Sequence, residues 1–457
     1  MTSPSKPPTM PSKPRPTTIP HLVYADCHGE IRDLPELQMA GRSGRDFQAP
    51  TLEALIPLPP GSELFVLPGR QPVGIDPASG EPLLLAEDPA TGEPVQAVAA
   101  FMAPAHTATL WTAYQRQDDH APPLPLFAYT AVGWHQDRFW VCAWRSDDDR
   151  RQEPDRYHSP AIEQQTRRRL RRSPANRLLQ HLGKCSLTYG CPAAVNYFMG
   201  QWEAPLPTSP TCNARCLGCI SLQPSGCCPA TQQRLEFVPT AAEIAEVAVE
   251  HLAKTGHVAS FGQGCEGEPL LQAATLAQAI GLIRRQTNQG RLNCNTNAGH
   301  PAAVAELRHA GLDAIRVSLN SAQEHYHQRY YRPLDFTLEQ VRESIRLMKA
   351  AGGFVSLNYF ILPGFTDDPA EFAALSELIA EYRPDFVQLR NLNMDMDWYL
   401  DALAFQPTGP PLGMLAWREQ LTARFPKLGL GYFNPPGPDY RPPHRRSTKN
   451  RRRTSRP

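Results

Sequence analysis

The chain has 457 residues, with 46 Lys and Arg against 45 Asp and Glu, and a formal net charge of +1. This near-neutral balance excludes a uniformly basic nucleic-acid-binding protein and leaves only local basic patches to consider. No apolar run approaches the ~18 residues that span a bilayer, and Met1–Pro20 lacks the apolar core of a signal peptide. We therefore expect no membrane association and no secretion, and we expect the eleven cysteines to be reduced thiols in the cytoplasm.

The first third of the chain is rich in proline, which is excluded from helix interiors and central strands. Residues 1–20 contain seven prolines and few apolar residues, which predicts a disordered leader. Residues 21–150 show short apolar runs broken by Pro and Gly, which predicts a small β-rich N-terminal domain. We expect strands at 63–69, 125–134 and 138–144, the last two as a hairpin, and turns at the repeated segments PASGEP (77–82) and PATGEP (89–94).

Two basic segments stand out from the neutral background. Residues 151–205 are predicted to form a basic helical linker, and residues 434–457 a disordered basic tail. The linker carries an arginine cluster that fits either a solvated helix face or a phosphate-binding patch, comprising Arg167, Arg168, Arg169, Arg171, Arg172 and Arg177. The tail fits either contact with a polyanion such as RNA or non-specific charge.

Residues 206–433 alternate between apolar strands and capped helices. A capping box links Thr240 to Glu243, and Asp368 with Pro369 opens a later helix. Repeated βα units with nearly continuous apolar strands indicate a parallel sheet buried on both faces. Counting a short strand before Cys212, the pattern gives about six units, so we expect an α/β fold with a partial (βα)6 TIM-type barrel; a doubly wound sheet is the alternative. The later strands are expected at 257–264, 291–298, 314–321, 354–362 and 385–393.

Polar residues follow the strands at the end where parallel α/β folds place their sites. Cys212, Cys216 and Cys219 follow the first strand in a CxxxCxxC pattern. Structural zinc sites usually take two separated CxxC pairs, whereas three close thiolates can hold three corners of an iron–sulfur cube and leave its fourth iron open. Later strands end in Glu266–Gly267–Glu268–Pro269, Asn295–Thr296–Asn297, Ser318–Leu319–Asn320–Ser321 and Leu362–Pro363–Gly364.

On these motifs, residues 206–433 resemble the core of radical S-adenosylmethionine (radical SAM) enzymes. Cys212, Cys216 and Cys219 match the cluster loop of that family, which implies a [4Fe-4S] cluster with S-adenosylmethionine as the second cofactor. The turn at 266–269 is similar to the family's Gly-Gly-Glu-Pro motif, which faces the methionine amino group, although Glu266 replaces the usual glycine. Gly218 likewise replaces the aromatic residue that often precedes the third cysteine and neighbours adenine.

The resemblance also implies cofactor contacts on three later strands and the turn. The residues expected to bind S-adenosylmethionine are Glu266, Gly267 and Glu268, then Ser318 and Asn320 for the ribose and carboxylate, and Gly364 for adenine. The implied activity is reductive cleavage of S-adenosylmethionine to a 5′-deoxyadenosyl radical that modifies RNA, a peptide or a small metabolite. An electron donor such as flavodoxin or ferredoxin would supply the electron. A non-catalytic iron–sulfur or zinc module that binds RNA is the alternative.

Other reactive residues leave alternatives open. Cys185, Cys191, Cys227 and Cys228 fit either an auxiliary cluster or ordinary buried and loop thiols, and the latter is favoured. Cys265 and Cys294 are interpreted as small core residues. Two further groups leave alternatives open. A substrate-facing loop or a helix start with solvated polar groups fits the segment with His325, His327, Arg329, Tyr330 and Tyr331. Asp395 and Asp397 fit either binding of a cationic substrate group or capping of a loop.

Overall fold

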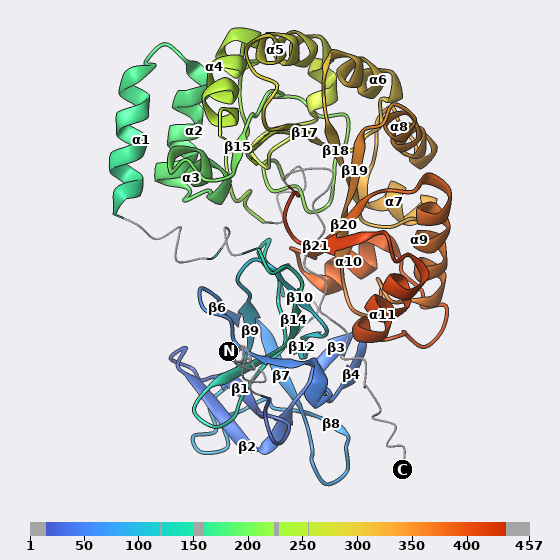
Figure 1. Cartoon of the computed structure of the whole chain (residues 1–457). Coiled ribbons are helices and arrows are strands. Elements are labelled where there is room, and N and C mark those ends of the chain that lie inside the picture. Colours follow the sequence, from blue (N-terminus) through green and yellow to red (C-terminus); the bar gives the residue numbers. More distant parts are fainter. Residues whose placement is uncertain are drawn as a thin grey trace, which may run out of the picture.

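A computed structural model describes residues 15–118, 121–149, 153, 160–223, 228–254 and 256–435. Most of the predicted leader and basic tail, and Cys227, lie outside these residues. Figure 1 shows a β-rich N-terminal part beneath an arc of helices that surrounds a parallel sheet. The N-terminal part and the arc are joined through a short helical segment that begins at residue 161.

The N-terminal part is built from short antiparallel strands. Most of them form one eleven-stranded sheet, and three others form a second small sheet. Their bounds are β1 (His21–Ala25), β2 (Ile31–Met39), β3 (Gly41–Ser43), β4 (Asp46–Gln48), β5 (Leu55–Pro57), β6 (Glu63–Leu67), β7 (Arg70–Ile75), β8 (Pro82–Leu84), β9 (Gln96–Phe101), β10 (His106–Ala108), β11 (Trp111–Thr112), β12 (Tyr114–Arg116), β13 (Val132–Trp134) and β14 (Phe139–Arg145).

Two local predictions in this part are confirmed. Strands β13 and β14 pair antiparallel in register Val132↔Val141, as the expected hairpin. The repeated segments form matching turns, because Gly80 N–H donates to the Asp76 carbonyl and Gly92 N–H to the Asp88 carbonyl, each at 2.8 Å. In both turns the aspartate side chain also accepts a backbone N–H two residues on, which is the usual way aspartate closes such a turn.

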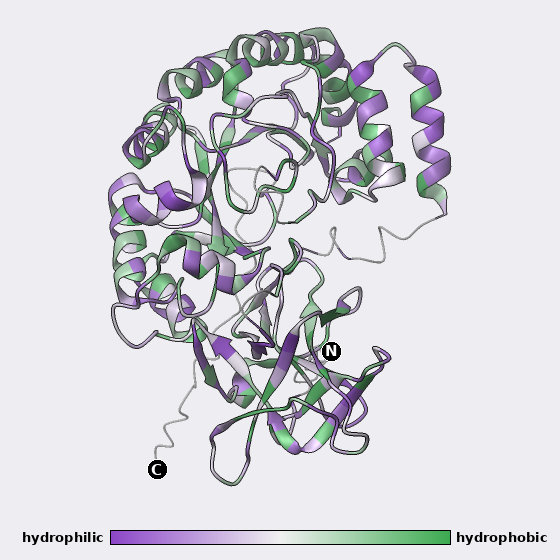
Figure 2. Cartoon of the chain, turned by 180° about the vertical axis from the view of Figure 1, so that it is seen from behind, coloured by the Kyte–Doolittle hydropathy of each residue, from purple (hydrophilic) through white to green (hydrophobic). Residues whose placement is uncertain are grey.

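The helical segment consists of α1 (Ala161–Arg172), α2 (Arg177–Thr188) and α3 (Pro192–Phe198). Helix α1 is largely hydrophilic, as Figure 2 shows, and Thr166 is its one buried residue. Helix α2 is amphipathic and buries Leu178, Leu179 and Leu182. Three members of the arginine cluster have acidic partners within the chain, since Arg167 pairs with Glu163, Arg169 with Glu250 and Arg177 with Glu243.

The second part of the chain forms a seven-stranded, entirely parallel sheet whose strands lie in sequence order. The α/β class and the curled parallel sheet are thus as expected. The final strand was missed, because three residues containing two glycines carry no alternation or apolar run. The strands are β15 (Glu203–Pro205), β16 (Val258–Phe261), β17 (Arg291–Thr296), β18 (Ala314–Leu319), β19 (Phe354–Ile361), β20 (Phe386–Asn391) and β21 (Gly429–Gly431).

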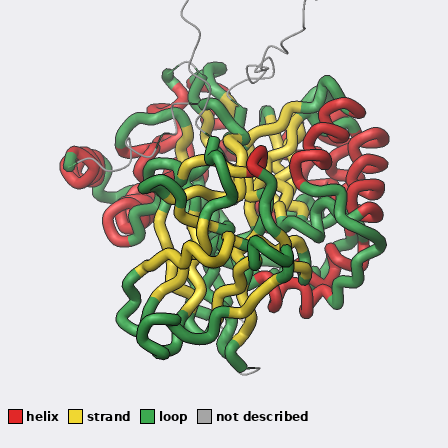
Figure 3. The backbone as a smooth tube through the Cα atoms, turned by 90° about the horizontal axis from the view of Figure 1, so that it is seen from below, coloured by secondary structure: helices red, strands yellow, loops and turns green. Residues whose placement is uncertain are grey.

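Helices connect these strands and cover the outer face of the sheet, as Figure 3 shows from below. They are α4 (Ala241–Leu252), α5 (Ala273–Gln286), α6 (Pro301–Ala310), α7 (Glu324–Tyr331), α8 (Leu338–Ala350), α9 (Pro369–Tyr382), α10 (Met396–Leu403) and α11 (Met414–Arg424). The Thr240–Glu243 capping box is present, and Asp368 caps α9.

The outer face of the parallel sheet is the main hydrophobic core. Alternate strand residues such as Leu292, Ile315 and Val317 pack with buried residues of the helices, including Leu276 and Ile345. Burial of these side chains at roughly 25 cal/mol per Å² of apolar surface is the dominant stabilising contribution. The intervening strand residues, many of them polar, face the opposite, concave side of the sheet because side chains alternate along a strand.

The N-terminal part packs against the carboxyl ends of β19 and β20, which is the end where sites form in parallel sheets. Gly44 N–H donates to the Pro363 carbonyl at 2.8 Å, and Asn391 exchanges two hydrogen bonds with β10, at 2.9 and 3.0 Å. A second hydrophobic core runs through this contact, since Val141 and Tyr129 belong to the same cluster as Leu217, Phe365 and Tyr399.

Candidate functional site

The three cysteines of the CxxxCxxC pattern lie together in the loop that follows β15. All three are free and partly exposed. Their charges act on one another: the pKa of Cys212 is raised to about 11 by burial and by nearby Glu268, and the pKa of Cys216 is raised by burial and by Cys212 and Cys219. The Arg234 guanidinium donates to Cys219 Sγ at 3.4 Å. The loop thus brings three thiols into one small volume beside a cation.

The cluster loop is held by backbone hydrogen bonds to the segment that ends α7. Arg215 N–H donates to the Tyr331 carbonyl at 2.9 Å, and Leu217 N–H donates to the Tyr330 carbonyl at 3.1 Å. Leu334 N–H donates back to the Asn213 carbonyl at 2.9 Å. Residues 324–331 are therefore a helix whose end supports the cluster loop, and Tyr330 and Tyr331 are buried. The helix that one interpretation expected is present, but its side chains are not all solvated, since His327 is also buried.

The turn at 266–268 lies directly against the start of the cluster loop. Gly267 N–H donates to the Ser209 carbonyl at 2.7 Å, and Glu268 N–H donates to the Thr211 carbonyl at 2.8 Å. A Cβ on Gly267 would lie 1.9 Å from the Thr211 oxygen, so this close approach requires glycine. The cluster loop and the 266–268 turn, about fifty residues apart in the sequence, are therefore joined by backbone hydrogen bonds.

The two glutamates of this turn are fully engaged with the protein. Glu266 Oε2 accepts from the N–H groups of Thr208 and Ser209, at 2.7 and 2.9 Å, and Oε1 accepts from Gln263 N–H. Burial raises the pKa of Glu266 to about 7. Glu266 therefore has a clear role in folding the segment before the cysteines, which a glycine at this position could not perform. Its expected contact with the methionine amino group stays a prediction.

Glu268 connects the turn to the end of the next strand. It accepts from Thr296 Oγ1 and from Asn297 N–H, the latter at 2.9 Å. Desolvation by burial raises its pKa, and its charge in turn raises the pKa of Cys212. Asn297 also donates to Asn213 in the cluster loop at 2.7 Å. The ends of three strands thereby converge on the cysteines.

Ser318 and Asn320 lie at the end of β18, and Asn320 is completely buried. Asn320 Nδ2 donates to the Tyr326 carbonyl and the Tyr399 hydroxyl, at 3.2 and 3.3 Å. Among the described residues, its Oδ1 has no hydrogen-bond partner. A buried amide oxygen without a donor is costly unless a ligand completes it. Asn320 is thus the strongest of the predicted cofactor contacts outside the cluster loop.

Gly364 has a different environment from the other predicted cofactor residues. It has φ +88°, and a Cβ there would lie 1.9 Å from the backbone nitrogen of Gly44. Contact with the N-terminal part is thus a sufficient reason for glycine at this position. Its expected contact with adenine stays a prediction.

Gly218 shows why the aromatic residue that often precedes the third cysteine is absent. A Cβ at Gly218 would lie 3.2 Å from both Met394 Sδ and the Tyr330 hydroxyl. Met394 and Tyr330 are themselves buried. These two side chains occupy the volume that an aromatic residue at 218 would need.

A polar layer on the concave face of the sheet was missed as a unit in the sequence. Glu203 Oε1 accepts from Ser260 Oγ at 2.7 Å, Asn293 donates to that same hydroxyl, and Arg316 donates to Gln388 Oε1 at 3.0 Å. The signal was present as alternation, since Asn293 and Asn295, and Arg316 and Ser318, recur with period two in their strands. The interior of the curled sheet is therefore lined by polar side chains that bond to one another.

Asp395 and Asp397 link the barrel to the N-terminal part. Asp395 Oδ2 pairs with Arg70 at 2.8 Å, and Asp397 Oδ1 pairs with Arg42 at 2.7 Å. Asp395 also caps α10 by accepting from the N–H groups of Asp397 and Trp398. The cationic partners of these two carboxylates are thus arginines of the chain itself, and the element that Asp395 caps is a helix rather than the expected loop.

The residues present fit an iron–sulfur cluster better than a mononuclear metal at the cluster loop. Three thiols from one loop, partly exposed and unpaired by disulfides, are the donor set of a cube with one open iron. Among the described residues, the three Sγ atoms are not gathered as tightly as the ligands of a single ion. Cys212, Cys216 and Cys219 would hold the cluster.

Comparison with protein families identifies this part of the chain. Residues 206–375 match the family model described as Radical SAM superfamily. The chain therefore contains a radical SAM domain, and the resemblance drawn from its motifs is confirmed over that range. None of the curated proteins compared matches the chain.

Solved structures with a similar fold include radical SAM proteins. A radical SAM methyltransferase from Sphaerobacter thermophilus is 15% identical over 51% of this chain and 67% of its own, with a TM-score of 0.35. Methylornithine synthase (PylB) is 14% identical over 60% of this chain and 71% of its own, with a TM-score of 0.37. SuiB from Streptococcus suis bound to S-adenosylmethionine is 11% identical over 59% of this chain and 61% of its own, with a TM-score of 0.35. The activities in these names are those of the neighbours.

Proposed function

We propose that the chain is a radical SAM enzyme that cleaves S-adenosylmethionine reductively and uses the resulting radical to modify a substrate. The observation that carries this proposal is the packing of the cluster loop against the 266–268 turn, through Gly267 and Glu268. The six successive strands β15 to β20 with their helices would form the open (βα)6 barrel. The polar concave face would hold the substrate.

The chemistry depends on a [4Fe-4S] cluster bound by Cys212, Cys216 and Cys219. When bound, the cluster supplies one electron that breaks the S–C5′ bond of S-adenosylmethionine, releasing methionine and a 5′-deoxyadenosyl radical that removes a hydrogen atom from the substrate. A one-electron donor such as flavodoxin or ferredoxin would restore the electron.

The chain's own residues would orient the cofactor and exclude solvent. Asn320 Oδ1, which is buried and has no hydrogen-bond donor among the described residues, would accept a hydrogen bond from S-adenosylmethionine. The 266–268 turn would lie on the methionine side, with Ser318 beside the ribose and Gly364 beside adenine. The N-terminal part covers the rim of the sheet at β19 and β20, which would limit access of water and oxygen to a radical.

No helix in the described part of the chain is long and apolar enough to cross a membrane. The ten described cysteines are all free, which supports a reducing compartment such as the cytoplasm. RNA, a peptide and a small metabolite stay open as substrates. For RNA, the internal partners of Arg167, Arg169 and Arg177 leave the basic tail as the better candidate contact.

The test is anaerobic reconstitution with iron and sulfide, followed by reduction with dithionite in the presence of S-adenosylmethionine. Wild-type protein should release 5′-deoxyadenosine, and Cys216→Ala should abolish its formation. Cys27→Ala is the matched control because Cys27 is exposed and distant in sequence. A cluster-loaded wild-type protein that yields no deoxyadenosine would favour the alternative, a non-catalytic metal-binding module.

RNA binding has its own test. Retention of the full-length protein on RNA at low salt, compared with a variant lacking residues 441–457, measures the contribution of the basic tail. Contact with several phosphates should weaken steeply as salt rises. Equal, negligible retention of both proteins would remove RNA from the candidate substrates.

A further inference from the structure

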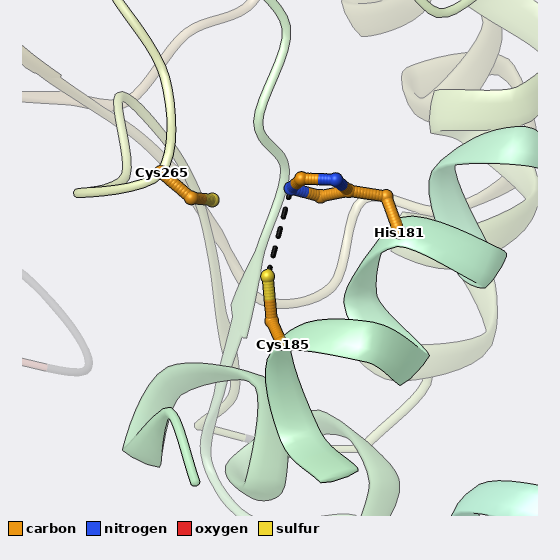
Figure 4. Close-up of side chains that lie close together, drawn as sticks. All are labelled: His181, Cys185 and Cys265. Carbon is orange, nitrogen blue, oxygen red and sulfur yellow. Dashed lines mark hydrogen bonds between the residues drawn. The ribbon is translucent and has the colours of Figure 1, made fainter. Parts of the chain in front are cut away.

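A second group of metal-ligating side chains lies outside the cluster loop. His181 and Cys185 lie one turn apart on α2, and Cys265 comes from the loop after β16. Figure 4 shows the three side chains pointing toward one another from these two elements. Cys185 Sγ lies 3.6 Å from His181 Nε2, and the ligand atoms of all three residues lie within 4.8 Å of one another.

A fourth ligand is available at the start of α3. Cys191 packs against the small buried cluster formed by Cys185, Ala194 and Cys265. Its backbone N–H donates to the Cys185 carbonyl at 3.0 Å, which fixes the turn between α2 and α3. Cys191 Sγ is not among the ligand atoms that lie within 4.8 Å of one another, so it would have to move toward the other three to complete a set of three thiols and one imidazole.

The spacing of the His181 and Cys185 ligand atoms suits a single tetrahedral ion. Zn²⁺ binds Cys sulfur at about 2.3 Å and His nitrogen at about 2.0–2.1 Å, so two such ligands at a tetrahedral angle lie about 3.6 Å apart. The observed Sγ–Nε2 distance is 3.6 Å.

The position of the group gives it a structural consequence. Cys265 directly precedes the 266–268 turn, and its carbonyl accepts from Leu235 N–H at 2.7 Å. An ion held jointly by α2 and Cys265 would tie the helical segment to the turn that supports the cluster loop. This structural connection does not depend on the proposed enzymatic activity.

We propose that His181, Cys185, Cys191 and Cys265 form a structural Cys3His zinc site. Structural zinc is typically held by four protein ligands of this kind and stabilises the fold that gathers them. Cys265 is buried in a small core cluster, as interpreted from the sequence, and the proposed ligand role would add to that packing.

The experiment measures bound metal in full-length protein purified without reconstitution. In a Cys212→Ala/Cys216→Ala/Cys219→Ala background, which removes the cluster-loop thiols, we expect about one zinc per chain. Adding Cys185→Ser and Cys265→Ser should remove it. Adding Cys27→Ser and Cys294→Ser, which alters two cysteines outside the group, should leave it bound.

A second measurement reads the ligand set spectroscopically. Exchange of zinc for Co²⁺ should give the d–d bands of a tetrahedral ion and an intense thiolate charge-transfer band, which Cys191→Ser should reduce by about one third. Chelation of the metal should lower the thermal midpoint. Three results would each overturn the proposal: no bound zinc, iron and sulfide bound in place of zinc, or a Cys185–Cys265 disulfide in the mass spectrum.

Discussion

Arg70 in β7 and Asp395 at the start of α10 form an ion pair of 2.8 Å that joins the N-terminal part to the barrel. The exposed fractions of the two side chains are 1% and 0%. Asp395 Oδ2 also accepts from Leu124 N–H at 3.0 Å, and Arg70 Nη1 donates to the Pro68 carbonyl at 3.0 Å, whereas Arg70 Nε has no hydrogen-bond partner among the described residues. The pair lies next to the ends of strands β19 and β20, where the candidate site forms.

Removing one partner of this pair should be costly, because it leaves a buried charge uncompensated. Arg70→Met should lower the free energy of unfolding by about 3–5 kcal/mol, measured by urea denaturation. The double variant Arg70→Met/Asp395→Asn should recover part of that loss. Arg45→Ala, which removes a neighbouring pair with Asp401 whose side chains are each 54% exposed, should change stability by less than about 1 kcal/mol. Equal effects of both single variants would contradict the argument.

Gly267→Ala should disturb the cluster loop without touching a cysteine. The new Cβ would lie 1.9 Å from the Thr211 oxygen, so the chain just before Cys212 must move. We expect iron uptake on reconstitution to fall by at least half, together with a loss of about 1–3 kcal/mol in stability. Gly281→Ala in α5 is the control, because the nearest atom to its Cβ is 3.6 Å away. Full iron loading of Gly267→Ala would show that the turn does not support the loop.

Asn320→Ala should weaken binding of S-adenosylmethionine while leaving the cluster intact. Its Oδ1 is buried and lacks a partner, and one hydrogen bond is worth about 1 kcal/mol, which corresponds to a several-fold rise in the dissociation constant. Equilibrium binding to the reconstituted protein measures this change, and the iron content serves as the internal control. Unchanged affinity would remove Asn320 from the cofactor site.

The buried His251 side chain should make the stability of the folded state sensitive to acid. It is 3% exposed, and burial, with His257 nearby, lowers its pKa from 6.5 to about 3. A lowered histidine pKa means that stability is fully present above pH 6.5 and is lost as the pH falls toward 3, because the folded state resists protonation. At about 1.4 kcal/mol per pKa unit, the loss amounts to a few kcal/mol.

His251→Gln keeps a side-chain donor for the Trp202 carbonyl and removes the titration. Its stability should therefore change less than that of the wild type between pH 6.5 and 3, in unfolding curves recorded at successive pH values. His28→Gln alters an exposed histidine and should follow the wild-type profile. Parallel profiles for wild type and His251→Gln would contradict this account.

The local elements and the cluster loop could be predicted from the sequence because their signals are local. Capping pairs such as Thr240–Glu243 and the CxxxCxxC spacing each lie within a few residues. By contrast, α10 was missed because the run after β20 mixes Met, Trp and Asp, and Asp395 is needed as both helix cap and partner of Arg70. These two roles of Asp395 depend on a tertiary contact, which leaves no signal in the local sequence.

The convergence of His181, Cys185 and Cys265 could not be predicted for the same physical reason. Two of the ligands lie on α2 and the third lies eighty residues later, after a strand, so no spacing rule connects them. The Arg70–Asp395 pair spans 325 residues and likewise leaves no local signal. Sequence patterns identify which residues can bind, whereas long-range packing determines which of them meet.

The central claim is that three cysteines hold a cluster with one iron left open for S-adenosylmethionine. The most direct measurement is the electron paramagnetic resonance spectrum of the reduced, reconstituted protein before and after that cofactor is added. We predict that the wild-type signal changes shape on addition, because the cofactor binds the open iron. An identical spectrum in both samples, with a full complement of about four irons per chain, would contradict the claim.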